Sequence, residues 1–309
     1  MKYCVVFGCC TMDIAIYESD GTEVVSFGGK GGNQAVALSR AGVKTYMLTK
    51  FSAVKDDKRS TKMHIKNLKK NKVDTKYIAF DKELLNDYTK INISKNGDND
   101  LMERIIISQN IDVDYVKKNK QVFENAEYVL LQMKVPIEAT REVVKICKEA
   151  NVKIVLTPCR PKKLENNIDI LEDVSYITCN QKEAELIFGE GKKLSAKKLE
   201  ETLKKYPNKL IVTLGGKGVK YFDGKKVVTE KAIEGLSVLD TTGAGDTFCA
   251  NFVSVLFDGG TISEAVQKAI CSSSIKIQTK GTQKGMPKKK QRDELFLKIY
   301  KNKGENKND

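Results

Sequence analysis

The chain has 309 residues, of which 40% are hydrophobic and 30% charged, and its formal net charge is +14. This length and balance predict a globular protein with one large core, and we expect neither a signal peptide nor a membrane-spanning segment. The positive charge raises nucleic-acid binding as an alternative, but lysines are spread along the chain and aromatic residues make up only 7%. We therefore expect a basic, solvated surface that favours anionic ligands, no specific nucleic-acid partner and a cytoplasmic location.

Cysteine and histidine usage limits the available chemistry. The eight cysteines form no C-x-x-C pair, so neither a zinc ribbon nor a thioredoxin-like site is expected, and buried thiols are the default. The single histidine, His64, lies in a Lys-rich, helix-like stretch. Catalysis is therefore not expected to depend on histidine.

The first third of the chain contains a carboxylate and a glycine-rich segment. Residues 3–7 are predicted to form a buried strand, and Asp13 follows it, where it can either meet a ligand at the sheet edge or stabilise a turn. Four glycines in 28–32 precede a predicted helix, and Lys30 and Asn33 beside them can bond the hydroxyls of a polar ligand. The spacing matches neither a P-loop nor a dinucleotide fingerprint.

Further along, the hydrophobic pattern predicts an α/β fold. Residues 44–49 read as a strand and 57–71 as an amphipathic helix, and 88–93 with 101–107 read as a hairpin. Strands are then expected at 128–132, 153–157, 174–178 and 210–214, with helices at 137–150, 182–188 and 195–206. This alternation predicts a parallel sheet covered on both faces.

Polar and glycine-rich segments follow two of these strands. Asn180 and Glu183 lie one helical turn apart, a spacing suited to magnesium-bound waters or phosphate. The glycine-rich run 215–218 follows Thr213. A capping box at 261–264 begins the last predicted helix, which is expected to reach about residue 277, and Gly281 ends it. Each signal alone is more often turn chemistry than a site, but all lie at the sheet edge where open α/β folds bind ligands.

The segment 239–257 combines a tight turn with a buried helix. Gly243, Ala244 and Gly245 are small enough for a ligand to approach the backbone. The free N–H groups and positive dipole end of the following helix form a ready anion site. Asp246 lies there too, where a carboxylate can cap the helix or take a proton from an attacking hydroxyl.

The two glycine-rich segments, 28–37 and 240–248, resemble the two signatures of the ribokinase (PfkB-type) sugar kinases, and the likeness covers nearly the whole chain. It implies one three-layer α/β/α domain, 1–309, with a mostly parallel central sheet. It also implies a small β-sheet lid from about 14–27 and 88–107, frequently the contact of a homodimer. The implied reaction transfers the γ-phosphoryl group of ATP to a sugar hydroxyl, with D-ribose the expected substrate, Mg²⁺ required and K⁺ activating.

The resemblance also assigns roles to individual residues. The catalytic set is Asp246 with the amides of Gly243, Ala244 and Gly245. The sugar-binding set is Thr11, Asp13, Gly29, Lys30, Gly31, Asn33, Lys134 and Asp246. The ATP and magnesium set is Asn180, Glu183, Thr213, Gly215, Gly216, Gly218 and Gly245. The monovalent-cation set is Asp240 and Thr242 with Lys276, Thr279, Gly281 and Gly285, in which Lys276, Thr279 and Gly281 contribute carbonyl oxygens.

Three departures from the family pattern concern the sugar. Ribokinases usually carry Asn where this chain has Thr11 and Glu where it has Lys134, and fewer residues than usual separate Asp13 from Gly28, which predicts a trimmed lid. A kinase for a different sugar, a sugar acid or a nucleoside is therefore the alternative. A non-catalytic sugar- or nucleotide-binding protein is a further one, against which the intact Gly-Ala-Gly-Asp run argues.

Overall fold

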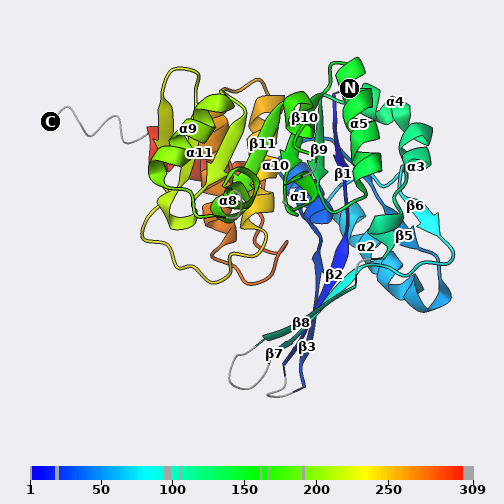
Figure 1. Ribbon diagram of the computed structural model, residues 1–309. Coiled ribbons are helices and arrows are strands. Elements are labelled where there is room, and N and C mark those ends of the chain that lie inside the picture. The colour runs from blue at the N-terminus through cyan, green and yellow to red at the C-terminus, as the bar shows by residue number, and fades with distance from the viewer. Residues whose placement is uncertain are drawn as a thin grey trace.

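The computed structural model describes residues 2–17, 21–93, 99–104, 106–160, 162–165, 167–189 and 192–301. Its body is built on an eight-stranded sheet in the order β14-β13-β12-β11-β10-β9-β1-β4 (Figure 1). The strands are β1 Cys4–Phe7, β4 Thr45–Leu48, β9 Tyr128–Gln132, β10 Lys153–Thr157, β11 Tyr176–Asn180, β12 Leu210–Thr213, β13 Val219–Phe222 and β14 Val227–Glu230. The six strands from β4 to β12 run parallel, and β13 and β14 add an antiparallel edge.

Helices cover both faces of this sheet because its parallel strands bury both sets of side chains. In β1, Val5 and Phe7 face one core, and Cys4 and Val6 face the other. The first core is covered by α3 Val113–Lys118, α4 Lys120–Glu124, α5 Ile137–Glu149, α6 Lys162–Glu165, α7 Ile170–Asp173, α8 Gln181–Phe188 and α9 Ala196–Lys205. The second is covered by α1 Lys30–Arg40, α2 Lys58–Lys70, α10 Ala244–Phe257 and α11 Ile262–Lys276, and α12 Lys289–Phe296 packs on α11.

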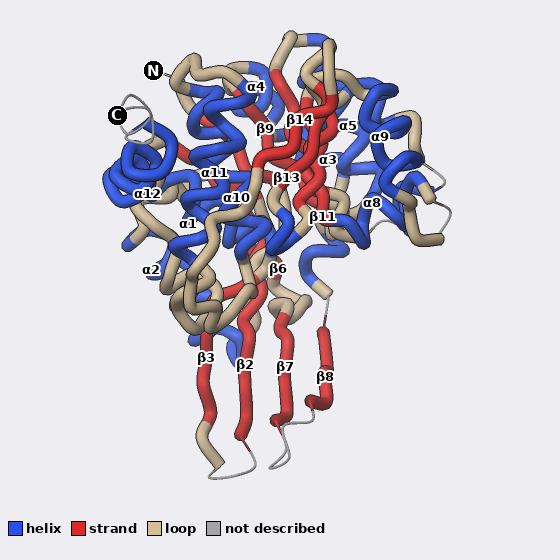
Figure 2. The backbone as a smooth tube through the Cα atoms, turned by 90° about the vertical axis from the view of Figure 1, so that its left-hand side faces the viewer, coloured by secondary structure: helices blue, strands red, loops and turns tan. Residues whose placement is uncertain are grey.

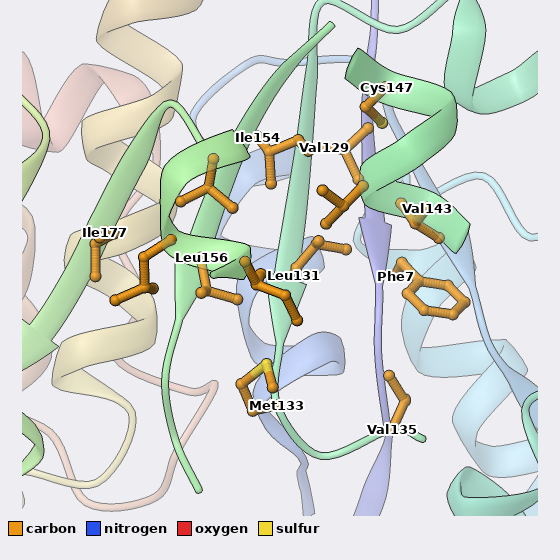
Figure 3. Close-up of a cluster of buried hydrophobic side chains, with 14 of the residues drawn as sticks. Phe7, Val129, Leu131, Met133, Val135, Val143, Cys147, Ile154, Leu156 and Ile177 are labelled. Atoms are coloured by element: carbon orange, nitrogen blue, oxygen red, sulfur yellow. The ribbon is translucent and has the colours of Figure 1, made fainter. Parts of the chain in front are cut away.

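Figure 3 shows the first core, in which Phe7 and Leu131 of the sheet lie near Val143 and Cys147 of α5. These side chains are 0 to 1% exposed. Removing a large aliphatic or aromatic side chain of this kind from water stabilises a fold by about 1.5–3 kcal/mol. The core therefore fixes the strand ends, where the functional residues lie.

A second sheet extends away from the body as a narrow ribbon (Figures 1 and 2). It has the order β3-β2-β7-β8, with β2 Thr11–Tyr17, β3 Glu23–Gly28, β7 Tyr88–Ile93 and β8 Asn99–Arg104. Strand β2 pairs antiparallel with β3 and parallel with β7, so Asp13 lies opposite both Ser26 and Thr89. Of the turn expected at 95–100, residues 95–98 lie outside the described residues, and Asn99 and Asp100 already belong to β8.

Several elements differ from the sequence expectations. Strand β11 begins at Tyr176, two residues later than expected, because Val174 ends α7 and the strand takes its register from β12 through Ile177 and Leu210. The β13–β14 hairpin, α3, α4 and α12 were not predicted. The remaining elements are short: β5 Lys50–Ser52, β6 Ala79–Asp81, the 3₁₀ turns Lys55–Asp57, Ile107–Asn110 and Gly215–Lys217, and a π-helical turn at Leu297–Lys301.

Among the described residues, no helix combines the length and apolar character that crossing a membrane requires. The polar tail predicted from 302 to 309 lies beyond them.

Candidate active site

The amino-terminal ends of α1 and α10 meet, and between them lies the carboxylate of Asp246. Helix α10 begins after Gly243, whose φ of 78° is in the left-handed region that glycine adopts without cost. Asp246 in its first turn is 4% exposed, and its Oδ2 accepts a 2.9 Å hydrogen bond from Nδ2 of Asn33. Lys30 Nζ lies 4.0 Å from Oδ1 of the same carboxylate. The glycine-rich segment that contains Lys30 and Asn33 and the one that ends at Asp246 therefore form one site.

The start of α10 is open toward this carboxylate. An α-helix leaves its first N–H groups without intrahelical acceptors, and its dipole makes that end positive. At Gly245, which is exposed, an added Cβ would meet no atom within 4 Å, whereas at Gly243 it would meet Thr282 at 2.9 Å. The turn is thus closed behind by Thr282 and open in front. An anion can lie against the amides beside Asp246.

A buried amide network fixes the other side of the carboxylate. Gln34 donates from Nε2 to Thr157 Oγ1 at 3.1 Å and, at 3.4 Å, to Oδ1 of Asp246. Its own Oε1 accepts a 2.6 Å hydrogen bond from Nε2 of Gln132. None of Gln34, Thr157 and Gln132 was predicted from the sequence to belong to the site. The available signal was that Gln132 and Thr157 are the polar last residues of two predicted parallel strands.

Three charges lie within electrostatic reach of one another at this point. The Asp246 carboxylate raises the pKa of Lys30, so Lys30 is a permanent ammonium at the site. Burial raises the pKa of Glu183; the ammonium of Lys30 opposes this rise, and the carboxylate of Asp246 adds to it. The Lys30 ammonium therefore interacts electrostatically with both Asp246, the candidate base, and Glu183, the residue expected to serve the nucleotide.

The residues predicted to hold the sugar lie where the ribbon sheet joins α1. Thr11 donates from Oγ1 to Oδ1 of Asp13 at 3.1 Å. Gly29 has a φ of 79°, and a Cβ there would lie 2.6 Å from the Thr11 nitrogen; a Cβ on Gly31 would lie 2.7 Å from the carbonyl oxygen of Cys9. The glycines are thus needed because the start of α1 lies directly against the backbone of 8–11.

Lys134 lies close to the same segment. It is half-buried, its N–H donates to the Gln132 carbonyl at 2.8 Å, and its own carbonyl accepts from the side chain of Gln109. Burial raises the pKa of the Cys9 thiol to about 11, and the positive charge of Lys134 opposes that rise. The ammonium of Lys134 therefore acts on the segment that supports Gly31.

On the nucleotide side, Asn180 and Glu183 form a reciprocal capping box at the start of α8. Asn180 Oδ1 accepts from the Glu183 N–H and Glu183 Oε2 from the Asn180 N–H, both at 2.9 Å. Their spacing is therefore explained first by helix capping, a signal that Asn-x-x-Glu before a helix carries. Asn180, but not Glu183, also lines a hollow of about 630 Å³ with a cationic edge. It is lined by Asn180, Gln181, Lys182, Glu185, Lys193, Thr213, Leu214 and Gly215.

The glycines beyond Thr213 have different reasons. Gly215 and Gly218 have φ values of 59° and 91°, and a Cβ on Gly218 would lie 1.9 Å from the Glu230 carbonyl oxygen. Gly216 has open space, with no atom within 4 Å of an added Cβ. Gly218 is therefore required by the hairpin, whereas Gly215 and Gly216 leave backbone accessible beside the hollow.

The residues predicted to bind K⁺ lie around Asp240, but the cation among them is the ammonium of Lys276. Asp240 Oδ1 accepts from the Thr242 N–H and Oδ2 from the Gly281 N–H, both at 2.8 Å. The ammonium of Lys276 lies 2.9 Å from the Asp240 carbonyl oxygen. The family resemblance implies that Lys276 offers its carbonyl to K⁺; instead its own ammonium lies there, and the residues do not fit a free K⁺.

The surroundings of Lys276 are closed. A Cβ on Gly285 would lie 2.8 Å from the Lys276 carbonyl oxygen and 2.7 Å from Cβ of Thr279, so these predicted residues do pack together. Burial raises the pKa of Asp240. The hydrogen bonds from Thr242 and Gly281 and the charge of Lys276 together lower that pKa by more than burial raises it, so the net shift is downward. Asp240 and Lys276 therefore form a charged pair.

Comparison with known proteins agrees with this geometry. Residues 1–289 match the model of the pfkB family of carbohydrate kinases, and the chain belongs to that family. It is 32% identical over 306 residues to the ribokinase of Bacillus subtilis, and the alignment covers 96% of this chain and 100% of that ribokinase. It is also 32% identical to the ribokinase of Lactococcus lactis, with 88% of each chain covered.

Solved structures show the same fold. The ribokinase of Arabidopsis thaliana, determined in complex with ribose and ATP, superposes with a TM-score of 0.85 at 22% identity, covering 96% of this chain and 99% of that one. The ribokinase of Thermotoga maritima gives 0.82 at 24% identity, with 96% and 100% covered. The expected three-layer, mostly parallel α/β fold with a small second sheet and the expected class of carbohydrate kinase are confirmed.

Proposed function

We propose that this protein is an ATP-dependent ribokinase that converts D-ribose and ATP to ribose 5-phosphate and ADP. The observation that carries the proposal is the buried Asp246 carboxylate, held by Asn33 beside the open start of α10. This arrangement places a proton acceptor and an anion site side by side. The similarity to curated ribokinases supports the choice of ribose.

In the proposed reaction, a sugar hydroxyl attacks the γ-phosphorus of ATP and gives its proton to Asp246. A new bond forms between the sugar oxygen and the γ-phosphorus, the bond from that phosphorus to the β–γ bridging oxygen breaks, and ADP leaves. The amides of 243–246 and the ammonium of Lys30 stabilise the charge on the transferring group. Phosphoryl transfer needs mainly positioning and charge stabilisation, which these groups supply.

ATP is proposed to lie in the hollow beside Thr213 and Gly215, with its phosphates directed toward α10. Lys182 and Lys193 at the edge of the hollow suit an anionic ligand. Mg²⁺ usually keeps several waters and needs only one or two carboxylates in addition to phosphate oxygens. Glu183 fits that requirement, and Mg²⁺, when bound, neutralises phosphate charge.

The sugar is proposed to lie among Asp13, Gly29, Lys30 and Asn33, covered by the ribbon sheet as a lid. The same sheet exposes Val24 and Val25, which are 47% and 39% accessible and suit the contact of a homodimer. The eight cysteines, all free thiols, agree with a reducing cytoplasm. K⁺ activation is not part of this proposal, because the Lys276 ammonium lies at the place where K⁺ was expected.

A second candidate is a kinase for a different or acidic sugar. It is favoured by Lys134, because an ammonium can only donate hydrogen bonds and prefers a negative partner. Its charge reaches Cys9 and Cys159, which flank the site. The two candidates share the phosphate chemistry and differ only in the acceptor.

The deciding experiment measures ADP release with Mg²⁺-ATP and a panel of pentoses, hexoses, sugar acids and nucleosides. Ribose should give the highest kcat/KM, and the product should carry phosphate on the 5-hydroxyl. A higher kcat/KM for a sugar acid would favour the second candidate. If no acceptor in the panel gave ADP release, the kinase proposal would be overturned.

A further inference from the structure

Lys276 brings a buried cation to the segment that precedes the anion site. It is the last residue of α11, its side chain is 0% exposed, and its Nζ lies 2.9 Å from the Asp240 carbonyl oxygen and 4.0 Å from Asp240 Oδ2. A buried ammonium is stable only when opposite charge and hydrogen-bond acceptors surround it. Asp240 supplies both, and the negative end of the α11 dipole adds to them.

The charge at Asp240 is connected directly to the start of α10. Asp240 holds the N–H groups of Thr242 and Gly281, and the carbonyl of the intervening Thr241 accepts the Ala244 N–H at 3.1 Å. Ser273, one turn before Lys276 on α11, donates to the Ala244 carbonyl at 3.0 Å. Through these bonds the position of Lys276 determines the shape of the turn that presents the anion-binding amides.

A free monovalent cation would have to share this place with the ammonium. K⁺ binds where several oxygens converge without a neighbouring positive charge, and two like charges a few ångströms apart in a buried site repel strongly. The Asp240 carbonyl oxygen is already bonded to Lys276, and both carboxylate oxygens accept backbone N–H groups. The pocket is therefore filled by a cation that belongs to the chain.

We infer that Lys276 is a tethered monovalent cation that orders residues 240–246 in place of free K⁺, so that this kinase works without K⁺. The inference deepens the proposed function and rests on it. An apolar residue at 276 would leave the half-buried Asp240 without its counter-charge, and a short one would also open a space beside it. Loss of the lysine should therefore create a dependence on K⁺ that the native protein lacks.

The test compares the native protein with Lys276→Ala and Lys276→Met in KCl, NaCl and tetramethylammonium chloride at equal ionic strength. Native ribose phosphorylation should change less than twofold between K⁺ and tetramethylammonium. Lys276→Ala should lose at least tenfold in kcat without K⁺ and regain most of it with K⁺, whereas Lys276→Met, which fills the space, should not be rescued. Lys280→Ala, at an exposed lysine four residues further on, is the matched control and should behave as the native protein.

Thermal unfolding in the same salts gives a readout that does not require turnover. KCl should raise the Tm of Lys276→Ala relative to tetramethylammonium chloride and leave the native Tm unchanged. Tenfold activation or clear thermal stabilisation of the native protein by K⁺ would overturn the inference while leaving the kinase proposal standing. An Ala variant as active and as stable as the native protein without K⁺ would overturn it as well. Failure of every acceptor in every salt would instead count against the proposed function, and the melting curves would still decide the role of Lys276.

Discussion

Asn33 donates a 2.9 Å hydrogen bond to Asp246 and accepts one of 3.1 Å from Gln283 Nε2. Gln283 in turn accepts from Asn67 at 2.8 Å, so the orientation of the Asn33 amide is set on both sides. The amide can then present only its NH₂ group to the carboxylate. The Asp246 carboxylate is consequently held in one orientation beside the start of α10, as a general base requires.

Asp246→Asn should lower kcat by about 10²–10⁴, the usual contribution of a positioned general base. The amide has nearly the same shape as the carboxylate, so the fold and the Kd for ADP should be unchanged. Steady-state kinetics and calorimetric titration of ADP measure the two quantities. Asp258→Asn, at the exposed ion pair with Lys289 after the same helix, is the control and should keep the native rate. Turnover of Asp246→Asn close to native would contradict the assignment.

Gln34→Met should reduce both stability and kcat. The change removes the contact with Asp246 and leaves the buried Gln132 NH₂ group only a long 3.5 Å contact with the Leu130 carbonyl oxygen, a loss that costs about 1–3 kcal/mol of unfolding free energy. Because Gln34 positions the base without touching the nucleotide site, KM for ATP should stay within twofold of native. Urea unfolding and kinetics test this, with exposed Gln121→Met as the control. A stability loss with unchanged kcat would show a purely structural role.

Glu183→Gln should separate stability from activity. Burial raises the pKa of Glu183, so the folded state favours the protonated carboxyl over the ionised one. The stability that the protonated carboxyl contributes is lost as pH rises through the raised pKa. Glutamine keeps the capping bond to Asn180 and carries no charge. The variant should therefore gain in Tm relative to native as pH rises above 4.5, while needing more Mg²⁺ for half-maximal rate. Equal Mg²⁺ dependence in the two proteins would argue against a role for Glu183 at the metal.

His64 should make the fold sensitive to mild acid. It is 2% exposed and stacks on Phe51 at 5.0 Å between ring centroids, and its Nε2 has no hydrogen-bond partner within the part of the chain that the structure describes. Burial lowers its pKa to about 4 from 6.5. The unfolded chain thus binds the proton more tightly, and about 3 kcal/mol of stability present above pH 6.5 should be lost as pH falls toward 4.

The single histidine makes this prediction easy to follow. Its ring protons are the only histidine signals in an NMR spectrum, so its titration in the folded protein can be read directly. His64→Phe should weaken the pH dependence of urea unfolding between 4 and 6.5, because phenylalanine does not titrate. A folded-state pKa near 6.5 would disprove the burial argument.

Lys134→Glu tests which sugar the site prefers. If Lys134 contacts the acceptor, glutamate should raise kcat/KM for ribose and lower it for sugar acids, each by at least threefold, because the sign of the partner charge is reversed. The product ratio for ribose and a sugar acid, measured in one competition assay, reports both effects. If ribose is the best acceptor of the native protein and the variant changes its kcat/KM by less than threefold, the altered-substrate hypothesis is wrong.

The sequence by itself determined the features that depend on local backbone and on periodicity. Alternating apolar segments from residue 128 onward predicted the parallel sheet, because buried strands and amphipathic helices have different periods. Gly243 and the glycines at 28–32 predicted tight turns before two helices, since glycine adopts backbone angles and allows a close approach that other residues do not. Asp246 could be assigned to the start of α10 for the same local reason.

Only the tertiary structure decided which side chains meet across the sheet edge. Gln34 contacts Gln132 and Thr157, which are 98 and 123 positions away in the chain, because the start of α1 lies against the carboxyl ends of β9 and β10. The start of β11 was likewise set by pairing with β12 and not by its own apolar run. Lys276 shows the same limit most clearly: its charge could be read from the chain, but its burial beside Asp240 follows from how α11 packs behind the turn before α10. A long side chain has many rotamers, and packing alone selects the one that brings the ammonium to the carboxylate.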